Sequence, residues 1–223
     1  MNSLEIMRSR HSVRKYTDRK IEAEKAEKLQ EEIEKINKEN NLKFYLCLDN
    51  PNVFKANQPN YGSFSGCRNF FLLFGSKNDD EKIGYYGERL VLLAQSLGLN
   101  TCWAAVTFEK KAIPVKTPDN MKLHDVIALG YGENQGVPHK SKPIEKLAKI
   151  TENTPEWFIK GMEAAVLAPT AINQQRFYFE QVGERGVRAK ALFGPYSKTD
   201  IGIVKYHFEL GAGKENFEWV ENN

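Results

Sequence analysis

The sequence has few cysteines and histidines. The three cysteines, Cys47, Cys67 and Cys102, lie far apart among 223 residues and show no paired spacing. An odd, dispersed set argues against a disulfide framework and favours a reduced, cytoplasmic setting. The four histidines show no ligand spacing to cysteines or acidic residues, so we predict no metal site.

Long apolar runs and a large excess of one charge are missing as well. The N-terminal stretch M-N-S-L-E-I-M-R-S-R has no apolar core of signal-peptide length, and no run reaches the length of a membrane span. The 32 basic and 29 acidic residues are mixed along the chain and give a net charge of +3, without the segregated basic face of a nucleic-acid-binding protein. We therefore expect small-molecule partners, and neither nucleic acid nor membrane.

The apolar residues that are present, 41% of the chain, predict a mixture of helices and strands with a substantial core. The unbroken apolar run N-F-F-L-L-F-G indicates a buried strand, and the loop over residues 50–66 is long enough to be functional. Helices are expected over residues 21–40, 79–97, 155–167 and 200–211, and strands over 42–48, 69–75, 101–106, 125–132 and 177–182.

Two segments of the second half align with the first half in the same order. Residues 173–179 match 40–46, and residues 200–212 match 82–94, which pairs Gly202 with Gly84. We interpret this as an internal duplication. The prediction is a single domain over residues 1–223, with one pseudo-repeat over about 1–148 and a second over about 149–223.

The stretch R-H-S-V-R-K-Y, residues 10–16, places three cations and a hydroxyl behind a short helix. Arginine forks and serine hydroxyls match the oxygens of a phosphate group, so the stretch indicates a phosphate site. A solvated surface run of charges is the alternative interpretation.

Four stretches together resemble the FMN-dependent nitroreductases. Residues 10–14 are similar to that family's Arg-x-Ser-x-Arg/Lys phosphate motif, and residues 84–103 to its central helix and Gly-Leu-Gly-Thr-Cys-Trp turn. Residues 127–132 with Lys140 and Lys142 are similar to its Gly-Tyr strand and basic pair, and residues 168–175 to its Pro-Ser-x-x-Asn-x-Gln loop. The resemblance implies an α+β fold with a mixed, mainly antiparallel sheet surrounded by helices.

The same resemblance assigns residues to FMN. Phosphate binding is implied for Arg10, Ser12, Arg14, Lys140 and Lys142, with His11 interleaved among them. Contacts to the ring are implied for Ala104, Ala105, Val106, Pro169, Thr170, Asn173 and Gln175. Tyr61, in the long loop, is expected to line the substrate pocket.

The activity that the resemblance implies belongs to the cofactor. NADH or NADPH would pass hydride to flavin N5, and a nitroaromatic, a quinone or a similar acceptor would then receive it, with no catalytic residue required. A non-enzymatic FMN storage or sensing protein is the alternative, and a protein for another phosphorylated ligand is a weaker one.

One departure from the family concerns the Pro-Ser-x-x-Asn loop, which in the usual homodimer reaches the partner's flavin. Here that loop lies late in the chain, and the equivalent position in the first half keeps only Asn40. The second half has no counterpart of Arg10-x-Ser12-x-Arg14. We therefore expect one chain to imitate the dimer and to complete the flavin site alone, so that a monomer would suffice.

Overall fold

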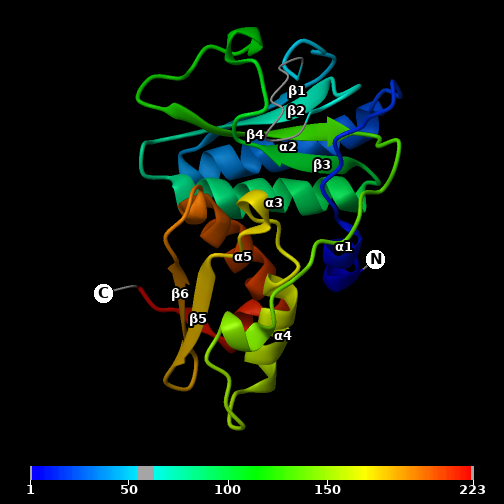
Figure 1. Cartoon of the computed structure of the whole chain (residues 1–223). Coiled ribbons are helices and arrows are strands. Elements are labelled where there is room, and N and C mark those ends of the chain that lie inside the picture. Colours follow the sequence, from blue (N-terminus) through cyan, green and yellow to red (C-terminus); the bar gives the residue numbers. More distant parts are fainter. Residues whose placement is uncertain (1, 55–62, 222–223) are drawn as a thin grey trace.

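Helices and strands are interspersed along the chain, and one short strand follows the last long helix (Figure 1). The computed structural model describes residues 2–54 and 63–221. Within them the helices are α1 (Ser3–Ser9), α2 (Ala23–Asn40), α3 (Asp80–Ser96), α4 (Glu156–Ala165) and α5 (Ser197–Ala212). The strands are β1 (Lys43–Cys47), β2 (Asn69–Gly75), β3 (Asn100–Ala104), β4 (Lys122–Gly130), β5 (Phe177–Val182), β6 (Gly186–Ala191) and β7 (Glu218–Trp219).

The first four strands form an antiparallel sheet in the order β1-β2-β4-β3. Every residue of β2 is buried, because both faces of the sheet are covered. Phe71 and Leu73 pack in the core that α2 and α3 share with the sheet, while Phe70, Leu72 and Phe74 pack against connecting segments on the other face. The prediction of a buried strand over residues 69–75 is therefore confirmed.

The remaining strands form a second sheet, β5-β6-β7, in which β6 and β7 are parallel. Its core holds Phe179 of β5, Phe158 of α4 and Phe208 of α5. The predicted α+β class with mainly antiparallel pairing is confirmed, although the strands divide between two sheets. Strands β6 and β7 were not predicted, because G-V-R-A-K-A mixes small and charged residues and a two-residue strand has no period.

Helices α3 and α5 join the two sheet layers, with α3 under the first sheet and α5 in the lower half of Figure 1. Their backbones touch at two glycines. A Cβ atom added at Gly84 would lie 1.9 Å from the carbonyl oxygen of Thr199, and one added at Gly202 would lie 1.9 Å from that of Glu81. The contact is reciprocal, and it involves the two glycines that the sequence alignment treats as equivalent positions. Duplication of the whole chain stays a prediction.

The predicted phosphate-binding stretch, residues 10–16, runs as an extended chain beside β3. Ser12 forms a parallel bridge with Thr101, the amide of Val13 donates to the Thr101 carbonyl at 3.0 Å, and the amide of Tyr16 donates to Ser65 at 2.9 Å. In extended chain the side chains alternate between two sides, so the spacing directs Ser12 and Arg14 one way. Val13 is buried in the core on the other side.

No helix of the described residues is both long and apolar enough to cross a bilayer. All three cysteines are buried and free, in agreement with the prediction of no disulfide. Burial raises the pKa of Cys47 to about 11 and that of Cys67 to about 12, so both thiols stay protonated and unreactive at neutral pH.

Candidate functional site

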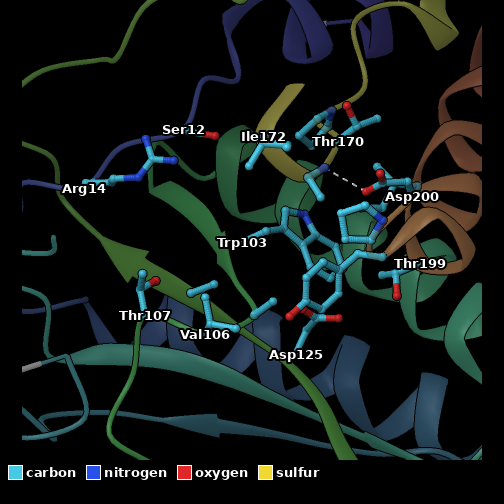
Figure 2. Close-up of a pocket in the computed structure, with 17 residues that line it drawn as sticks. Ser12, Arg14, Trp103, Val106, Thr107, Asp125, Thr170, Ile172, Thr199 and Asp200 are labelled. Carbon is cyan, nitrogen blue, oxygen red and sulfur yellow. Dashed lines mark hydrogen bonds between the residues drawn. The ribbon is translucent and has the colours of Figure 1, made fainter. Parts of the chain in front are cut away.

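A cavity of about 320 Å³ lies between the first sheet and the start of α5 (Figure 2). This volume falls within the range of roughly 300–1,000 Å³ usual for small-molecule sites. Both halves of the chain supply its walls. The lining residues are Ser12, Arg14, Trp103, Ala104, Ala105, Val106, Thr107, Asp125, Pro169, Thr170, Ala171, Ile172, Pro195, Tyr196, Thr199, Asp200 and Ile203.

One end of the cavity is basic. Ser12 and Arg14 lie there, to the left in Figure 2, and come from the extended segment beside β3. The Arg14 side chain has no hydrogen bond or ion pair with any residue in the described ranges. A guanidinium without a counter-charge, next to a hydroxyl, is suited to an anionic ligand group.

Arg10 lies behind this end instead of lining it. The residue is only 4% exposed; its Nε lies 3.9 Å from Glu88 Oε1 and has no hydrogen bond. Burial lowers the pKa of the guanidinium, while Glu88 counteracts this effect. Glu88 also accepts a hydrogen bond from Trp103 Nε1 at 2.9 Å and lies 2.9 Å from His207 Nε2. The buried side chain of Glu88 thus contacts Arg10 of the predicted phosphate-binding stretch, Trp103 of the cavity wall and His207 of α5.

The first wall follows β3 where this strand ends. Ala104, Ala105 and Val106 line the cavity, as the sequence predicts for residues beside the ring, and Trp103 joins them. These side chains are apolar and small apart from the indole, which Glu88 holds in place. The surface suits a flat, largely apolar ligand.

The second wall is a strained loop. Pro169, Thr170 and Ile172 line the cavity, and the backbone turns into the left-handed region at Ile172, where φ is 47°. Asn173 and Gln175 also have positive φ, of 54° and 46°. A β-branched residue rarely adopts this conformation, and the Ile172 side chain is 79% exposed. Such strain persists only where surrounding contacts fix it, and it is concentrated at functional sites.

Gln175 supplies much of that fixation. Its amide, 3% exposed, donates to the Lys140 carbonyl at 3.0 Å and to Asn173 Oδ1 at 2.9 Å, and it accepts from the Lys142 amide at 2.7 Å. Asn173 Nδ2 donates to the same Lys140 carbonyl at 3.0 Å. The predicted residues Asn173 and Gln175 therefore tie two loops together and do not line the cavity.

The other predicted residues lie around the cavity without lining it. Lys142 Nζ donates to the carbonyls of Gln174 and Gln175 at 2.8 and 3.0 Å, so this ammonium also supports the strained loop. Lys140 is exposed, and His11 Nδ1 lies 3.0 Å from the Gln135 carbonyl. A phosphate role for these three residues stays a prediction. Tyr61 lies outside the described residues.

Two buried aspartates line the end of the cavity away from Arg14 (Figure 2). Asp200 on α5 accepts from the Ala171 amide at 2.9 Å and from Gln174 Nε2 at 2.7 Å, and burial raises its pKa to about 6. Asp125 on β4 is 4% exposed. Burial, followed by the charges of Asp200 and Asp80, raises the pKa of Asp125 to about 8.

The comparison with known families decides the identity of the fold. The sequence profile described as "Putative TM nitroreductase" matches residues 2–212, almost the whole chain. The chain belongs to this nitroreductase family. Among curated proteins none matches its sequence.

Solved structures share the nitroreductase fold. A protein named as a "putative nitroreductase" from Thermotoga maritima superposes with a TM-score of 0.71 at 24% identity, over 100% of this chain and 90% of that one. A nitroreductase family protein from Clostridium difficile 630 superposes with a TM-score of 0.52 at 20% identity, over 70% of this chain and 100% of that one. A protein named FMN-dependent nitroreductase from Clostridium difficile R20291 superposes with a TM-score of 0.50 at 20% identity, over 67% of this chain and 98% of that one.

The sequence motifs of this nitroreductase predicted residues of both cavity walls, on β3 and on the strained loop, but they did not predict Asp125, Asp200 or Glu88. Two of these residues carried a signal in the sequence. Glu88 interrupts an apolar helix face, and Asp125 stands directly before the apolar run V-I-A-L. A charged residue within a buried element is rarely there by default, because burying it without a partner is unfavourable.

Proposed function

We propose that the chain is an FMN-dependent oxidoreductase that takes electrons from NADH or NADPH and delivers them to a nitroaromatic, a quinone or a similar acceptor. One observation carries this proposal. The Arg-x-Ser-x-Arg stretch and the Pro-Thr-x-x-Asn loop, from opposite halves of the chain, converge on a single cavity. Family membership supports it, as does the name FMN-dependent nitroreductase of one structural neighbour.

The residues present fit FMN. Ser12 and Arg14, which pairs with no residue in the described ranges, would hold the phosphate, and the buried Arg10 would add positive potential from behind. Charge-assisted hydrogen bonds of this kind are the strong ones, and the forked guanidinium matches phosphate oxygens. The chain therefore supplies an anion site without calling on Lys140 or Lys142.

The apolar part of the cavity would hold the ring between Ala104–Val106 and Pro169–Ile172. When bound, FMN supplies the hydride chemistry, accepting from the nicotinamide and passing electrons to the acceptor. The protein's part is to orient the ring, exclude water from its inner face and leave the outer face accessible. This division of work requires no nucleophile and no metal from the chain.

We further propose that one chain completes one site, as an internally duplicated nitroreductase would. The support is that Ser12, Arg14 and residues 169–172 of the same chain line the same cavity. Two inactive variants, R10A/R14A and P169A/N173A, are unfolded together and refolded as a mixture. Sites completed within a chain leave every chain defective. Recovered FMN binding in the mixture would show sites formed between chains.

The test of the function is the absorbance spectrum of the purified protein, followed by anaerobic titration with NADH and NADPH. We expect yellow protein that bleaches on titration and recovers its colour when a quinone is added. Yellow protein that does not bleach would favour the storage or sensing alternative. Protein that neither carries nor takes up FMN would favour a different phosphorylated ligand.

A further inference from the structure

We propose that Glu88 and His207 set the charge at the basic end of the cavity by sharing one proton, which leaves the positive charge of Arg10 available to a ligand phosphate. This inference rests on the proposed function and deepens it. Neither residue lines the cavity, so both act through Arg10. The specificity that follows is for FMN over riboflavin, since the phosphate is the group in which these two flavins differ.

The contacts of His207 are the first argument. Its side chain and that of Glu88 are fully buried. Both ring nitrogens face an oxygen: Nδ1 lies 3.2 Å from the Ala164 carbonyl, and Nε2 lies 2.9 Å from Glu88 Oε1. A carbonyl only accepts, so Nδ1 carries a proton, and without a second proton two lone pairs would meet between Nε2 and Oε1. The imidazole and the carboxyl group therefore share one proton and are neutral as a pair, whichever of them holds it.

The Arg10 guanidinium is then the net charge of this cluster, because a guanidinium does not lose its proton in proteins. Arg10 is 4% exposed, and its Nε is buried without a hydrogen-bond partner in the part of the chain that the structure describes. Glu88 Oε1, 3.9 Å away, is the oxygen in contact with His207, and Oε2 accepts from Trp103. A buried charge without a counter-charge is unfavourable, and an anionic ligand group would remove that cost.

The Cys102 thiol connects this charge with the cavity. Burial raises the pKa of the thiol, whereas the charge of Arg14, a hydrogen bond with Ser12 and the charge of Arg10 oppose the rise. Ser12 and Arg14 line the basic end. One buried side chain is thus affected by both residues of that end and by Arg10 behind them. This neighbourhood puts the Arg10 charge beside the position of a bound phosphate.

Two further titratable groups lie near the cluster and bring no negative charge. Burial raises the pKa of Tyr206 to about 12, so its phenol stays protonated. Burial also lowers the pKa of His139, and the charges of Arg10 and His207 lower it further. Glu88 is therefore the carboxylate that could cancel the charge of Arg10, and the shared proton prevents this.

The experiment titrates the flavin-free protein with FMN and with riboflavin, and quenching of flavin fluorescence gives both Kd values. In His207→Gln the shared proton is gone, so Glu88 stays ionised and neutralises Arg10. We expect the Kd for FMN to rise about tenfold, a change on the scale of one unit charge at close range, and the Kd for riboflavin to stay within about twofold. In Glu88→Gln the neutral imidazole accepts from the glutamine amide and Arg10 keeps its charge, so both Kd values should stay within about twofold of wild type.

The double variant E88Q/H207Q separates charge from packing. It lacks the carboxylate that cancels Arg10, so FMN binding should recover to within about threefold of wild type. A packing defect at His207 would not be repaired by a second substitution.

His124→Gln is the matched control, because His124 also joins a carboxylate and a carbonyl, those of Asp80 and Ser76, both at 2.8 Å, and does not line the cavity. It should leave both Kd values unchanged. A change of FMN affinity in Glu88→Gln in either direction would overturn the proposal, and this variant alone decides if His207→Gln does not fold. Equal weakening of FMN and riboflavin by His207→Gln, without recovery in E88Q/H207Q, would overturn it in favour of a packing role.

Failure of the proposed function is a separate result. Protein that binds FMN but is not bleached by NADH or NADPH would refute that function and still give the order of affinities that tests Glu88 and His207. If the protein takes up neither flavin, the same variants are titrated with inorganic phosphate by calorimetry, and the same order is expected. No phosphate binding, or equal binding by all variants, would overturn the inference.

Discussion

The two walls of the cavity are built by different means. The wall from the first half consists of β3 and the extended segment beside it, and backbone hydrogen bonds such as Val13 to Thr101 fix it. The wall from the second half is a loop with three residues at positive φ, and the side chains of Gln175, Asp200 and Asn173 fix it. A wall built on a ladder tolerates side-chain changes, whereas a wall built on a strained loop depends on a few polar groups.

Backbone strain in the second wall gives this difference an approximate size. Each non-glycine residue in an unfavourable backbone region costs on the order of 1–3 kcal/mol, which the surrounding contacts must offset. Substitutions in the first wall should therefore change what the cavity binds. Substitutions behind the second wall should change whether that wall keeps its shape.

The largest effect is expected at the basic end. Arg14→Ala should weaken FMN binding by about 2 kcal/mol or more, because a charge-assisted contact to phosphate is lost. Quenching of flavin fluorescence on titration gives the Kd. Lys15→Ala is the matched control, since Lys15 is an exposed cation of the same extended segment and does not line the cavity. An unchanged Kd in Arg14→Ala would remove the phosphate assignment.

Gln175→Leu should break the second wall. The change removes the acceptor of the Lys142 amide and a donor to the Lys140 carbonyl, so we expect unfolding free energy to fall by about 2 kcal/mol. Urea denaturation measures the loss. Gln181→Leu is the comparison, because the Gln181 amide also bonds two carbonyls but at an exposed hairpin, and its effect should be below about 1 kcal/mol. Equal losses would show that the strained loop has no special dependence on Gln175.

The two aspartates predict a pH dependence of stability. An unfolded aspartate ionises near its ordinary pKa, whereas folded Asp125 holds its proton to about pH 8. Between these values the folded state binds more protons, so stability falls as pH rises, by at most about 1.4 kcal/mol per pH unit for one proton. Asp125→Asn should flatten the decline between pH 6 and pH 8 and be more stable than wild type above it. Thermal unfolding across this range is the measurement; a wild-type curve that rises over the range would contradict it.

The smallest effects separate Asn173 from its predicted repeat-mate Asn40. Asn173→Ala releases a contact to the Lys140 carbonyl next to the cavity and should lower FMN retention or slow flavin reduction by about 1 kcal/mol. Asn40 donates to the Ile36 carbonyl of its own helix and also has a side-chain hydrogen bond with the part-exposed Tyr86, away from the cavity, so Asn40→Ala should change stability by less than about 1 kcal/mol and leave the flavin unaffected. Stopped-flow reduction of both variants tests the pair. Equal loss of flavin chemistry would mean that the first half keeps a working counterpart of the loop.

Much of the fold could be read from the sequence, because long elements carry a period. The helices and the strands β1 to β5 follow from apolar spacing, and Gly98, at φ 76°, ends α3 as expected of a helix-terminating glycine. Strands β6 and β7 could not be read, since their identity depends on pairing with β5 and not on their own residues.

The part of the site that could be predicted from the sequence is the part formed by recognisable motifs. The alternation in residues 10–14 directs Ser12 and Arg14 to one side, and both line the cavity. The motif did not predict that Arg10 would turn inward to Glu88, because that partner comes from a helix far along the chain. The environments of Asp125 and Asp200 were beyond sequence reasoning for the same reason, because the burial of Asp125 and the two donors to Asp200 are set by tertiary packing.

The glycine contact between α3 and α5 has a consequence for how ligands enter and leave. Packed helices usually accommodate a conformational change by small sliding movements, for which side chains act as the deformable layer. At Gly84 and Gly202 this layer is absent, since each backbone lies against a carbonyl of the other helix. We therefore expect the two halves to move as one rigid body around this crossing. Under the proposed function, a nicotinamide donor and an acceptor would exchange in every turnover; they would then be admitted by movements of the loops around the cavity, while the relative position of its two walls stays constant.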